Sequence, residues 1–187
     1  MERCAWCEGQ PEYIDYHDVE WGVPERDSRA LFECLTLEGF QSGLSWITIL
    51  KKRDGFRRAF KDFDPNVIAK WGDAEITTLL MDEGIVRHRG KIAATIKNAK
   101  AWQEIEADQG FSNFIWNYVD GKPLQPMRRS LADVPGKTEL STQISKDLKK
   151  AGFGFCGPTT VYAFMQATGL VNDHVTSCHR HAALLEN

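Results

Sequence analysis

Helix signals follow one another along nearly the whole chain, and strand signals are poor. Apolar residues recur at helical spacing, and no run alternates cleanly between apolar and polar residues. No Asn-Gly turn joins two β-branched stretches, so the sequence offers no clear hairpin from which a sheet could grow. This pattern predicts an all-α fold, and 187 residues fit a single helical domain with two lobes.

Capping residues mark the starts of the expected helices, and glycines mark several ends. The expected starts are Asp27 or Ser28, Ser45, Asp64-Pro65 and Asp73, and the expected ends are near Gly39, Gly84 and Gly110. A long amphipathic helix is expected between the last two of these glycines, and shorter helices at 112–119, 139–151 and 158–168. Residues 120–137 are rich in Pro and Gly, which predicts a long surface connection between the lobes.

The composition is that of an ordinary globular protein, with 42% hydrophobic and 26% charged residues. The first ten residues, MERCAWCEGQ, lack an apolar signal-peptide core, so we expect a cytoplasmic protein with reduced thiols. Residues 152–172 carry no charge, but their Gly, Thr, Pro and amide residues favour a buried helix over a membrane span. No feature requires more than a monomer, and no membrane partner is expected.

The net charge gives no sign of an anionic partner, but the distribution of charge along the chain does. The formal net charge of -3 argues against a protein that coats nucleic acid. However, residues 85–103 contain five Arg and Lys residues and no acid, and residues 51–61 contain six cations and only Asp54. Two such stretches suggest a face that meets an anion, with solvated helix faces as the alternative.

The two ends of the chain carry complementary half-sites for a metal ion. Cys4 and His17 lie near the start, and His174 and Cys178 near the end are spaced i, i+4, which suits one face of a helix or helical turn. Together they form a Cys2His2 set, which suits a tetrahedral structural zinc ion. A closed site of this kind would tie segment 1–20 to segment 170–180. For each half-site alone, core cysteine and structural histidine remain the alternative.

Other residues compete for a role near these half-sites. Cys4 and Cys7 form a C-x-x-C pair, which suits zinc or redox chemistry, and His179 and His181 lie beside the second half-site. A redox pair normally accompanies a thioredoxin-like βαβ pattern, which this sequence lacks. We therefore favour zinc. A catalytic zinc is disfavoured because four protein ligands leave no position for water.

Residues 84–91, GIVRHRGK, form a short loop between two expected helices and are called the hairpin loop below. The loop carries Arg87 and Arg89, and the start of the following helix can offer backbone N–H groups to a phosphate. The sequence therefore suggests a contact with the DNA backbone. An ordinary helical hairpin with exposed arginines is the equal alternative.

Glu38 lies in an otherwise apolar or small stretch, EGFQSGLSWITIL, in which no cation occurs before Lys51. Buried carboxylates are rare unless paired, so Glu38 is either a helix-surface residue or part of a site. Aromatic rings can stack on a flipped base, while a carboxylate accepts hydrogen bonds from its N–H groups. The aromatic residues of this region are Trp6, Tyr13, Tyr16, Trp21 and Trp46. The pattern favours a purine pocket, with aromatic core packing as the alternative.

Five stretches resemble members of the 3-methyladenine DNA glycosylase I family. They are RCAW, YHDVEWGVP, FQSGLSWITILKKR, GIVRHRGKI and GLVNDHVTSC, and the similarity runs from Arg3 to about Cys178. The resemblance implies a helix-hairpin-helix DNA glycosylase fold in which the hairpin loop grips the backbone of a bent, alkylated duplex. It also implies a structural zinc ion bound by Cys4, His17, His174 and Cys178.

The resemblance further implies a role for each pocket residue. It places 3-methyladenine between Tyr16 and Trp46, with Glu38 accepting hydrogen bonds from the base. Trp6, Tyr13 and Trp21 match other positions that line the pocket. Gly43 and Leu44 match the turn that fills the gap left in the duplex. The expected contacts from the hairpin loop to DNA fall on Arg87, Arg89, Gly90 and Lys91.

The sequence departs from the family pattern at a few points. Cys7 adds a thiol beside the expected ligands, and the tail HRHAALLEN adds histidines that could displace one of them. The wider superfamily usually carries a catalytic Asp after the hairpin, which this family lacks. Asp108 falls at roughly that distance, although a turn residue before Gly110 explains it more simply.

The expected activity is excision of 3-methyladenine from alkylated double-stranded DNA by hydrolysis of the N-glycosidic bond. A 3-methylated adenine is cationic, so selection lies in capturing an electron-poor ring between aromatic faces. No motif places a lysine as nucleophile, which predicts a free base and an abasic site without a lyase step. The alternative is a non-catalytic, zinc-stabilised helical module that binds DNA, although that alternative gives no reason for Glu38 among aromatic rings.

Overall fold

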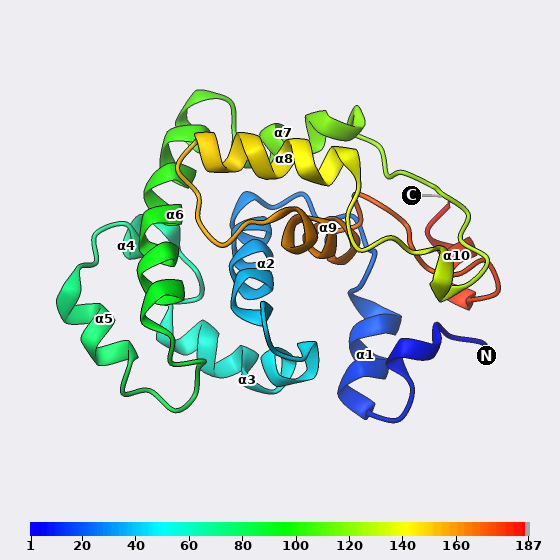
Figure 1. Cartoon of the computed structure of the whole chain (residues 1–187), viewed down its shortest axis with the longest axis horizontal. Coiled ribbons are helices and arrows are strands. Elements are labelled where there is room, and N and C mark those ends of the chain that lie inside the picture. Colours follow the sequence, from blue (N-terminus) through cyan, green and yellow to red (C-terminus); the bar gives the residue numbers. More distant parts are fainter. Residues whose placement is uncertain (186–187) are drawn as a thin grey trace.

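The computed structural model describes residues 1–185, and helices build nearly all of it (Figure 1). The central helix, α2 (Ser28–Gln41), packs against α3 (Trp46–Ala59), α6 (Arg89–Asp108), α7 (Phe111–Trp116) and α9 (Pro158–Ala167). The short helices α4 (Pro65–Ile68) and α5 (Asp73–Leu79) lie against α6, and α8 (Glu139–Lys150) lies against α9. Within the described residues, β pairing is limited to one isolated bridge between Leu124 and Val171. The predicted all-α fold is confirmed.

Most helix starts follow the predicted capping chemistry. The Asp27 carboxylate accepts hydrogen bonds from two backbone N–H groups in the first turn of α2. The Asp64 carboxylate accepts one hydrogen bond from a backbone N–H group in the first turn of α4. The prediction was one residue late for α5, where Gly72 is the N-cap and Asp73 is the first helical residue. Helix α6 begins inside the hairpin loop, because the His88 ring accepts a hydrogen bond from the Lys91 N–H at 3.1 Å.

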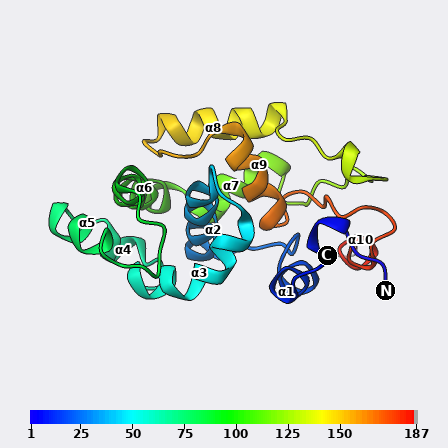
Figure 2. The same cartoon turned by 60° about the horizontal axis from the view of Figure 1, so that its bottom comes forward.

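Several short elements were not predicted, three of them near the ends of the chain and one within the connection 120–137. They are η1 (Ala5–Cys7), α1 (Pro11–Val19), η3 (Leu131–Asp133) and α10 (His179–Ala183), and η2 (Asn117–Val119) extends α7 as expected. A Pro at the first position of α1 was an available signal. The first residues of the chain and α10 lie at the same end of the molecule (Figures 1 and 2), where the His179 N–H donates to the Glu2 carbonyl at 3.0 Å.

A phenylalanine cluster fills the core between α2 and α3. The rings of Phe40 and Phe56 lie 4.7 Å apart, and those of Phe60 and Phe63 are stacked at 5.6 Å. All four side chains are buried. Such aromatic pairs contribute about 0.5–1.5 kcal/mol each beyond the burial of their area. This packing fixes the direction in which α3 leaves the C-terminal end of α2.

None of the helices that the structure describes is long and apolar enough to cross a membrane.

Gly55 lets the backbone of α3 approach the start of the hairpin loop. A Cβ atom at this position would lie 2.3 Å from the Gly84 carbonyl oxygen, which is too close for any side chain. We expect Gly55→Ala to lower the free energy of unfolding by about 1–3 kcal/mol, although alanine favours helix more than glycine does. Urea unfolding measures the change. Gly136→Ala, where a Cβ meets nothing within 4 Å, is the control and should stay within about 0.5 kcal/mol.

Candidate functional site

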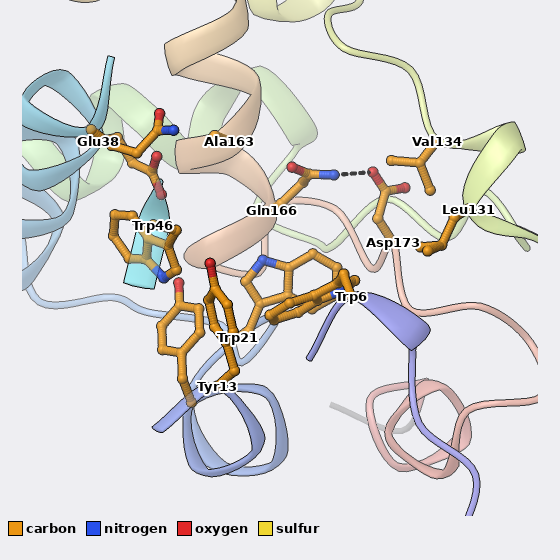
Figure 3. A pocket seen from close by; sticks show the side chains of 12 residues that line it. Trp6, Tyr13, Trp21, Glu38, Trp46, Leu131, Val134, Ala163, Gln166 and Asp173 are labelled. Atoms are coloured by element: carbon orange, nitrogen blue, oxygen red, sulfur yellow. Dashed lines mark hydrogen bonds between the residues drawn. The ribbon is translucent and has the colours of Figure 1, made fainter. Parts of the chain in front are cut away.

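A cavity of about 260 Å³ opens where the two ends of the chain meet α2 (Figure 3), and we call it the aromatic cavity. Its size lies near the lower limit of ligand pockets, roughly 300 Å³, which suits one small ring system. The first part of the chain supplies Trp6, Tyr13, Tyr16, Trp21, Glu38, Gln41 and Trp46 to its wall. The second part supplies Leu131, Val134, Ala163, Gln166 and Asp173. All six predicted pocket residues therefore line a single cavity.

The aromatic wall is built by edge-to-face contacts that start from Trp6. Its ring centroid lies 5.7 Å from that of Tyr13 and 5.0 Å from that of Trp21. On the opposite side, Tyr16 and Trp46 are 5.5 Å apart and tilted by 48°. A flat ring sandwiched between two others needs a spacing of roughly 7 Å, twice the carbon contact distance. The space between Tyr16 and Trp46 is therefore too narrow for a base in this conformation.

Glu38 is buried in the third turn of α2 and turns its side chain into the aromatic cavity (Figure 3). Neither a hydrogen bond nor an ion pair reaches its carboxyl group from the described part of the chain. Burial raises the pKa of Glu38 to about 8, because a charged carboxylate loses its hydration there. The cavity thus contains an unpaired acidic group that a cationic ligand would stabilise in its charged form.

The Cys/His cluster brings together Cys4, His17, His174 and Cys178, whose ligand atoms all lie within 4.8 Å of one another and are buried. The Sγ atom of Cys178 lies 3.4 Å from His17 Nε2 and 3.5 Å from His174 Nδ1. His174 and Cys178 do not share a helix: they face each other across a turn that ends at the N-cap of α10. This set of thiol and imidazole groups could hold a metal ion.

The remaining ring nitrogens of both histidines are held in place by oxygen acceptors. His17 Nδ1 lies 2.8 Å from Asp18 Oδ1, and Arg3 binds the same carboxylate through two nitrogens. His174 Nε2 lies 3.0 Å from the Trp21 carbonyl oxygen. These contacts leave His17 Nε2 and His174 Nδ1 to face the thiols. Because Trp21 also lines the aromatic cavity, the Cys/His cluster and the cavity share one wall.

Four other residues considered from the sequence lie outside these sites. The Cys7 thiol donates to the Cys4 carbonyl at 3.1 Å and is not among the four clustered ligands. The His179 ring lies between Glu2 and Asp18, while Asp108 ends α6 on its exposed side. None of these three lines the aromatic cavity. His181 is buried, but it is also absent from the cluster.

Three polar residues in the cavity wall were not predicted. Gln41 lies one turn after Glu38 on α2, so helical spacing could have identified it. Gln166 and Asp173 lie in or next to the uncharged stretch and gave no local signal. Asp173 is almost fully buried and accepts hydrogen bonds from Arg128, Tyr162 and Gln166. This network fixes the connection 120–137 against the cavity, so that segment is part of the site as well as a linker.

Two arginines of the basic stretch 51–61 form close ion pairs within the protein. Arg53 forms two hydrogen bonds to the Glu20 carboxylate, and Arg57 binds Glu33 at 2.7 Å. Arg58 lies 3.5 Å from Asp82. Lys51 lies 3.9 Å from Glu12, and the side chains of Lys51 and Arg58 are 53% and 66% exposed, so the interpretation of this stretch as an anion-binding face stays a prediction. An anion would have to compete with those acids.

The two arginines of the hairpin loop are exposed and only weakly paired with acids. The side chains of Arg87 and Arg89 are 49% and 57% exposed and only loosely paired, at 3.7 and 3.8 Å from acids. Gly90 is exposed beside them, whereas Lys91 is buried. Its ammonium group donates to the carbonyl of Phe40, in the last turn of α2, and to that of Ser42, in the exposed turn that follows α2. Gly43 and Leu44 lie in that exposed turn, residues 41–44, called the plug turn below.

Glu38 should make the stability of the protein depend on pH. Its pKa is about 8 in the folded state against an ordinary value of 4.5, so between these values the folded protein binds more protons than the unfolded chain. Wild-type stability therefore falls as pH rises through this window, and Glu38→Gln removes that loss. We expect the stability of Glu38→Gln relative to wild type to increase from pH 4.5 to 8 in urea unfolding.

Thr36→Ser, a change at another buried position of α2, is the control for this measurement. It introduces no titratable group and should shift the profile uniformly. Parallel profiles for wild type and Glu38→Gln would contradict the prediction.

A sequence model described as methyladenine glycosylase matches residues 6–181 of the chain. The DNA-3-methyladenine glycosylases of Escherichia coli K12 and Haemophilus influenzae are 50% and 52% identical to it, over 95% and 94% of this chain and 96% of each relative. A crystal structure of a 3-methyladenine DNA glycosylase I superposes with a TM-score of 0.93 at 52% identity, covering 95% of this chain and 98% of that one.

A structure of the Staphylococcus aureus enzyme, which addresses recognition of 3-methyladenine, gives a TM-score of 0.93 at 42% identity and covers 96% of both chains. The match to the family model spans the aromatic cavity, the hairpin loop and three of the four clustered residues, His17, His174 and Cys178. The chain belongs to the methyladenine glycosylase family.

Proposed function

We propose that this protein excises 3-methyladenine from alkylated double-stranded DNA and leaves an abasic site. The observation that carries the proposal is the unpaired, buried carboxyl group of Glu38 inside a cavity walled by aromatic rings. A cationic base would supply the charge partner that this group lacks in the protein. Membership of the methyladenine glycosylase family supports the same substrate.

Selection of the damaged base follows from the charges in the cavity. A 3-methylated adenine in DNA is cationic, so it gains cation–π attraction and an ion pair with a carboxylate, whereas neutral adenine stacks on the rings without either. Attraction between a cation and an aromatic face contributes about 0.5–2 kcal/mol. Glu38 adds a charge-assisted hydrogen bond in a space with little water. Binding of the cation also favours loss of the proton from Glu38.

Entry of the base requires the rings of Tyr16 and Trp46 to move apart. Trp46 can turn without losing a hydrogen bond, because its buried Nε1 has no partner within the described residues. A second cavity of about 290 Å³ borders both rings on their other side, which gives them room to move. The proposed capture therefore opens the space between Tyr16 and Trp46 as the base enters.

The chemistry needs little more than capture. The bond between the sugar C1′ and the base nitrogen breaks with its electron pair moving to the base, which departs neutral. Water then adds to C1′ and loses a proton to solvent. No lysine lines the aromatic cavity among the described residues, so the wall offers no amine for a Schiff base. The product is an abasic site without strand cleavage.

Contact with the duplex is assigned to the hairpin loop and the plug turn. Helices α5 and α6 with the loop between them correspond to the proposed helix-hairpin-helix element. The backbone N–H groups of Arg89 and Gly90 make no hydrogen bond within the described chain, so they can bind a phosphate at the N-terminus of α6. Leu44 is 41% exposed at the tip of the plug turn, where it can fill the place of a flipped base.

The Cys/His cluster is proposed to hold a structural zinc ion. For tetrahedral zinc with sulfur at 2.3 Å and nitrogen at 2.0–2.1 Å, a sulfur and a nitrogen ligand lie about 3.6 Å apart. Three of the four sulfur–nitrogen distances here are 3.4–3.6 Å, and all four ligand atoms lie within 4.8 Å of one another, which suits such a site. Zinc would fix the two ends of the chain that build the cavity wall. All four positions would be filled by protein, so zinc would not bind the attacking water.

Base release from methylated duplex DNA tests the proposed activity. We expect wild type to release 3-methyladenine, and Glu38→Gln and Trp46→Leu to lower kcat/KM about 10- to 100-fold, the value of a charged hydrogen bond or a stacking partner. In wild type, kcat/KM should rise with pH as Glu38 loses its proton near pH 8. Glu38→Gln should lack that rise.

Trp71→Leu is the control, because this ring packs against Phe60 in the core and does not line the cavity. It should retain wild-type kcat/KM. Duplex binding without any base release by wild type would instead identify a non-catalytic DNA-binding module.

Removal of a ligand tests the zinc site. We expect the purified protein to contain zinc by mass spectrometry, and Cys178→Ser to lose the metal. The variant should also lose at least about 10 °C in Tm, because metal binding energy contributes to folding. Cys7→Ser is the matched control, since Cys7 lies outside the cluster and should keep both zinc and Tm. Zinc-free wild type or zinc-bound Cys178→Ser would refute the assignment.

A further inference from the structure

Lys91 is a buried cation without an acidic partner in the described chain. Its side chain begins in the first turn of α6, yet only 7% of the residue is exposed. Its Nζ atom donates to the Phe40 carbonyl at 2.8 Å and to the Ser42 carbonyl at 2.6 Å. Burial lowers the pKa of Lys91, which reflects the cost of keeping an ammonium group here. A charge retained at such a cost implies a specific role.

The two carbonyls belong to the C-terminal end of α2. The last carbonyls of a helix lack partners within the helix and carry its partial negative charge, so a cation is favourable at this position. Helix α2 ends at Gln41, and Ser42 is its C-cap. The Lys91 ammonium group therefore serves as the cap that α2 does not obtain from its own sequence. The ring of Phe155, 6.0 Å away, helps to cover it.

The plug turn follows this capped helix end directly and is rigid by itself. The Leu44 N–H donates to the Gln41 carbonyl at 2.7 Å, and the Gln41 side chain donates back to the Leu44 carbonyl at 2.6 Å. Gly43 completes the turn at a φ of 84°, which L side chains rarely adopt. These contacts fix the shape of the plug turn, but they do not fix its position relative to the hairpin loop.

Lys91 supplies that connection, because it also ends the hairpin loop. Its backbone N–H binds the His88 ring at 3.1 Å, and it directly follows the exposed Gly90. One residue is thus tied to the hairpin loop through its backbone and to the plug turn through its side chain. To contact a phosphate instead, the ammonium group would have to leave both carbonyls.

We infer that Lys91 is a positioning residue that fixes the plug turn relative to the hairpin loop, so that both meet the duplex as one rigid surface. This role replaces the direct DNA contact expected from the sequence, and it rests on the proposed function. Without the ammonium group, the plug turn would no longer be held in the position from which Leu44 fills the gap left by the flipped base. A misplacement of about 1 Å in such a geometry can lower the rate about 100-fold.

Lys91→Met tests the inference, since it keeps the length and the apolar stem but removes the donors. We expect single-turnover excision to fall about 10- to 100-fold, and a 2-aminopurine next to an abasic-site analogue to report weaker insertion of the plug turn. Binding of free 3-methyladenine should stay at the wild-type level, because the aromatic cavity is unchanged. In a Leu44→Ala background, Lys91→Met should add less than about a twofold loss, since both changes act through one turn.

The salt dependence of duplex binding separates positioning from phosphate contact. Each phosphate contact contributes about 0.9 to the slope of log K against log salt. We expect Lys91→Met to weaken binding with an unchanged slope, and Arg89→Met, at the exposed neighbour, to reduce the slope by about 0.9. If Lys91→Met does not fold, Lys91→Gln, which retains one donor group, takes its place.

Two results would overturn the inference. In the first, Lys91→Met reduces the slope of log K against log salt by about 0.9 while its 2-aminopurine fluorescence equals that of wild type, which would identify a phosphate contact. The second is additive loss in the Leu44→Ala background. Failure of wild type itself to release 3-methyladenine would refute the proposed function, and the fluorescence and salt measurements would still decide the role of Lys91.

Discussion

The aromatic cavity exists because the two ends of the chain are held against each other. Its walls come from residues before 47 and after 130. Helices α2 and α9 join these two parts through the main core, whereas the segments nearest the two ends of the chain meet outside that core. The apolar cluster at this junction contains only Cys4, Val175 and Cys178, with Trp6 packed against it. At about 25 cal/mol per Å² such a small cluster stabilises weakly. The zinc ion proposed for the Cys/His cluster would add cohesion at this junction, where apolar contacts are few.

Helix α2 connects the remaining parts of the site. Asp27 caps its start, the buried side chains of Leu31, Phe32 and Leu35 hold it in the core, and Lys91 binds its last carbonyls. Glu38 points into the aromatic cavity from this helix, and the plug turn follows the C-terminal end of the same helix. A buried carboxyl group and an exposed leucine are thus placed by the same rigid element. The protein can bury an unpaired acid there because the surrounding packing leaves the helix no alternative position.

Local chemistry in the sequence predicted much of this arrangement. Caps and apolar spacing identified most helices, because these signals act within a few residues. Glu38 was recognisable because no cation follows it for twelve residues. The partners of the basic stretch 51–61 could not be predicted, since Glu20 and Glu33 meet it only through the packing of α1, α2 and α3. Lys91 was predicted to contact DNA because the carbonyl groups that accept its hydrogen bonds lie some fifty residues earlier and could not be identified from the sequence.

The narrow gap between Tyr16 and Trp46 has a consequence for inhibitor design. Any compound shaped to the empty cavity would complement a closed state in which the stacking site does not exist. A flat, positively charged heterocycle could instead push the rings toward the second cavity and gain two stacking faces at once. Its association would be limited by ring motion, while its residence would be prolonged by the same rings closing over it. Affinity in this pocket would therefore be governed by dissociation.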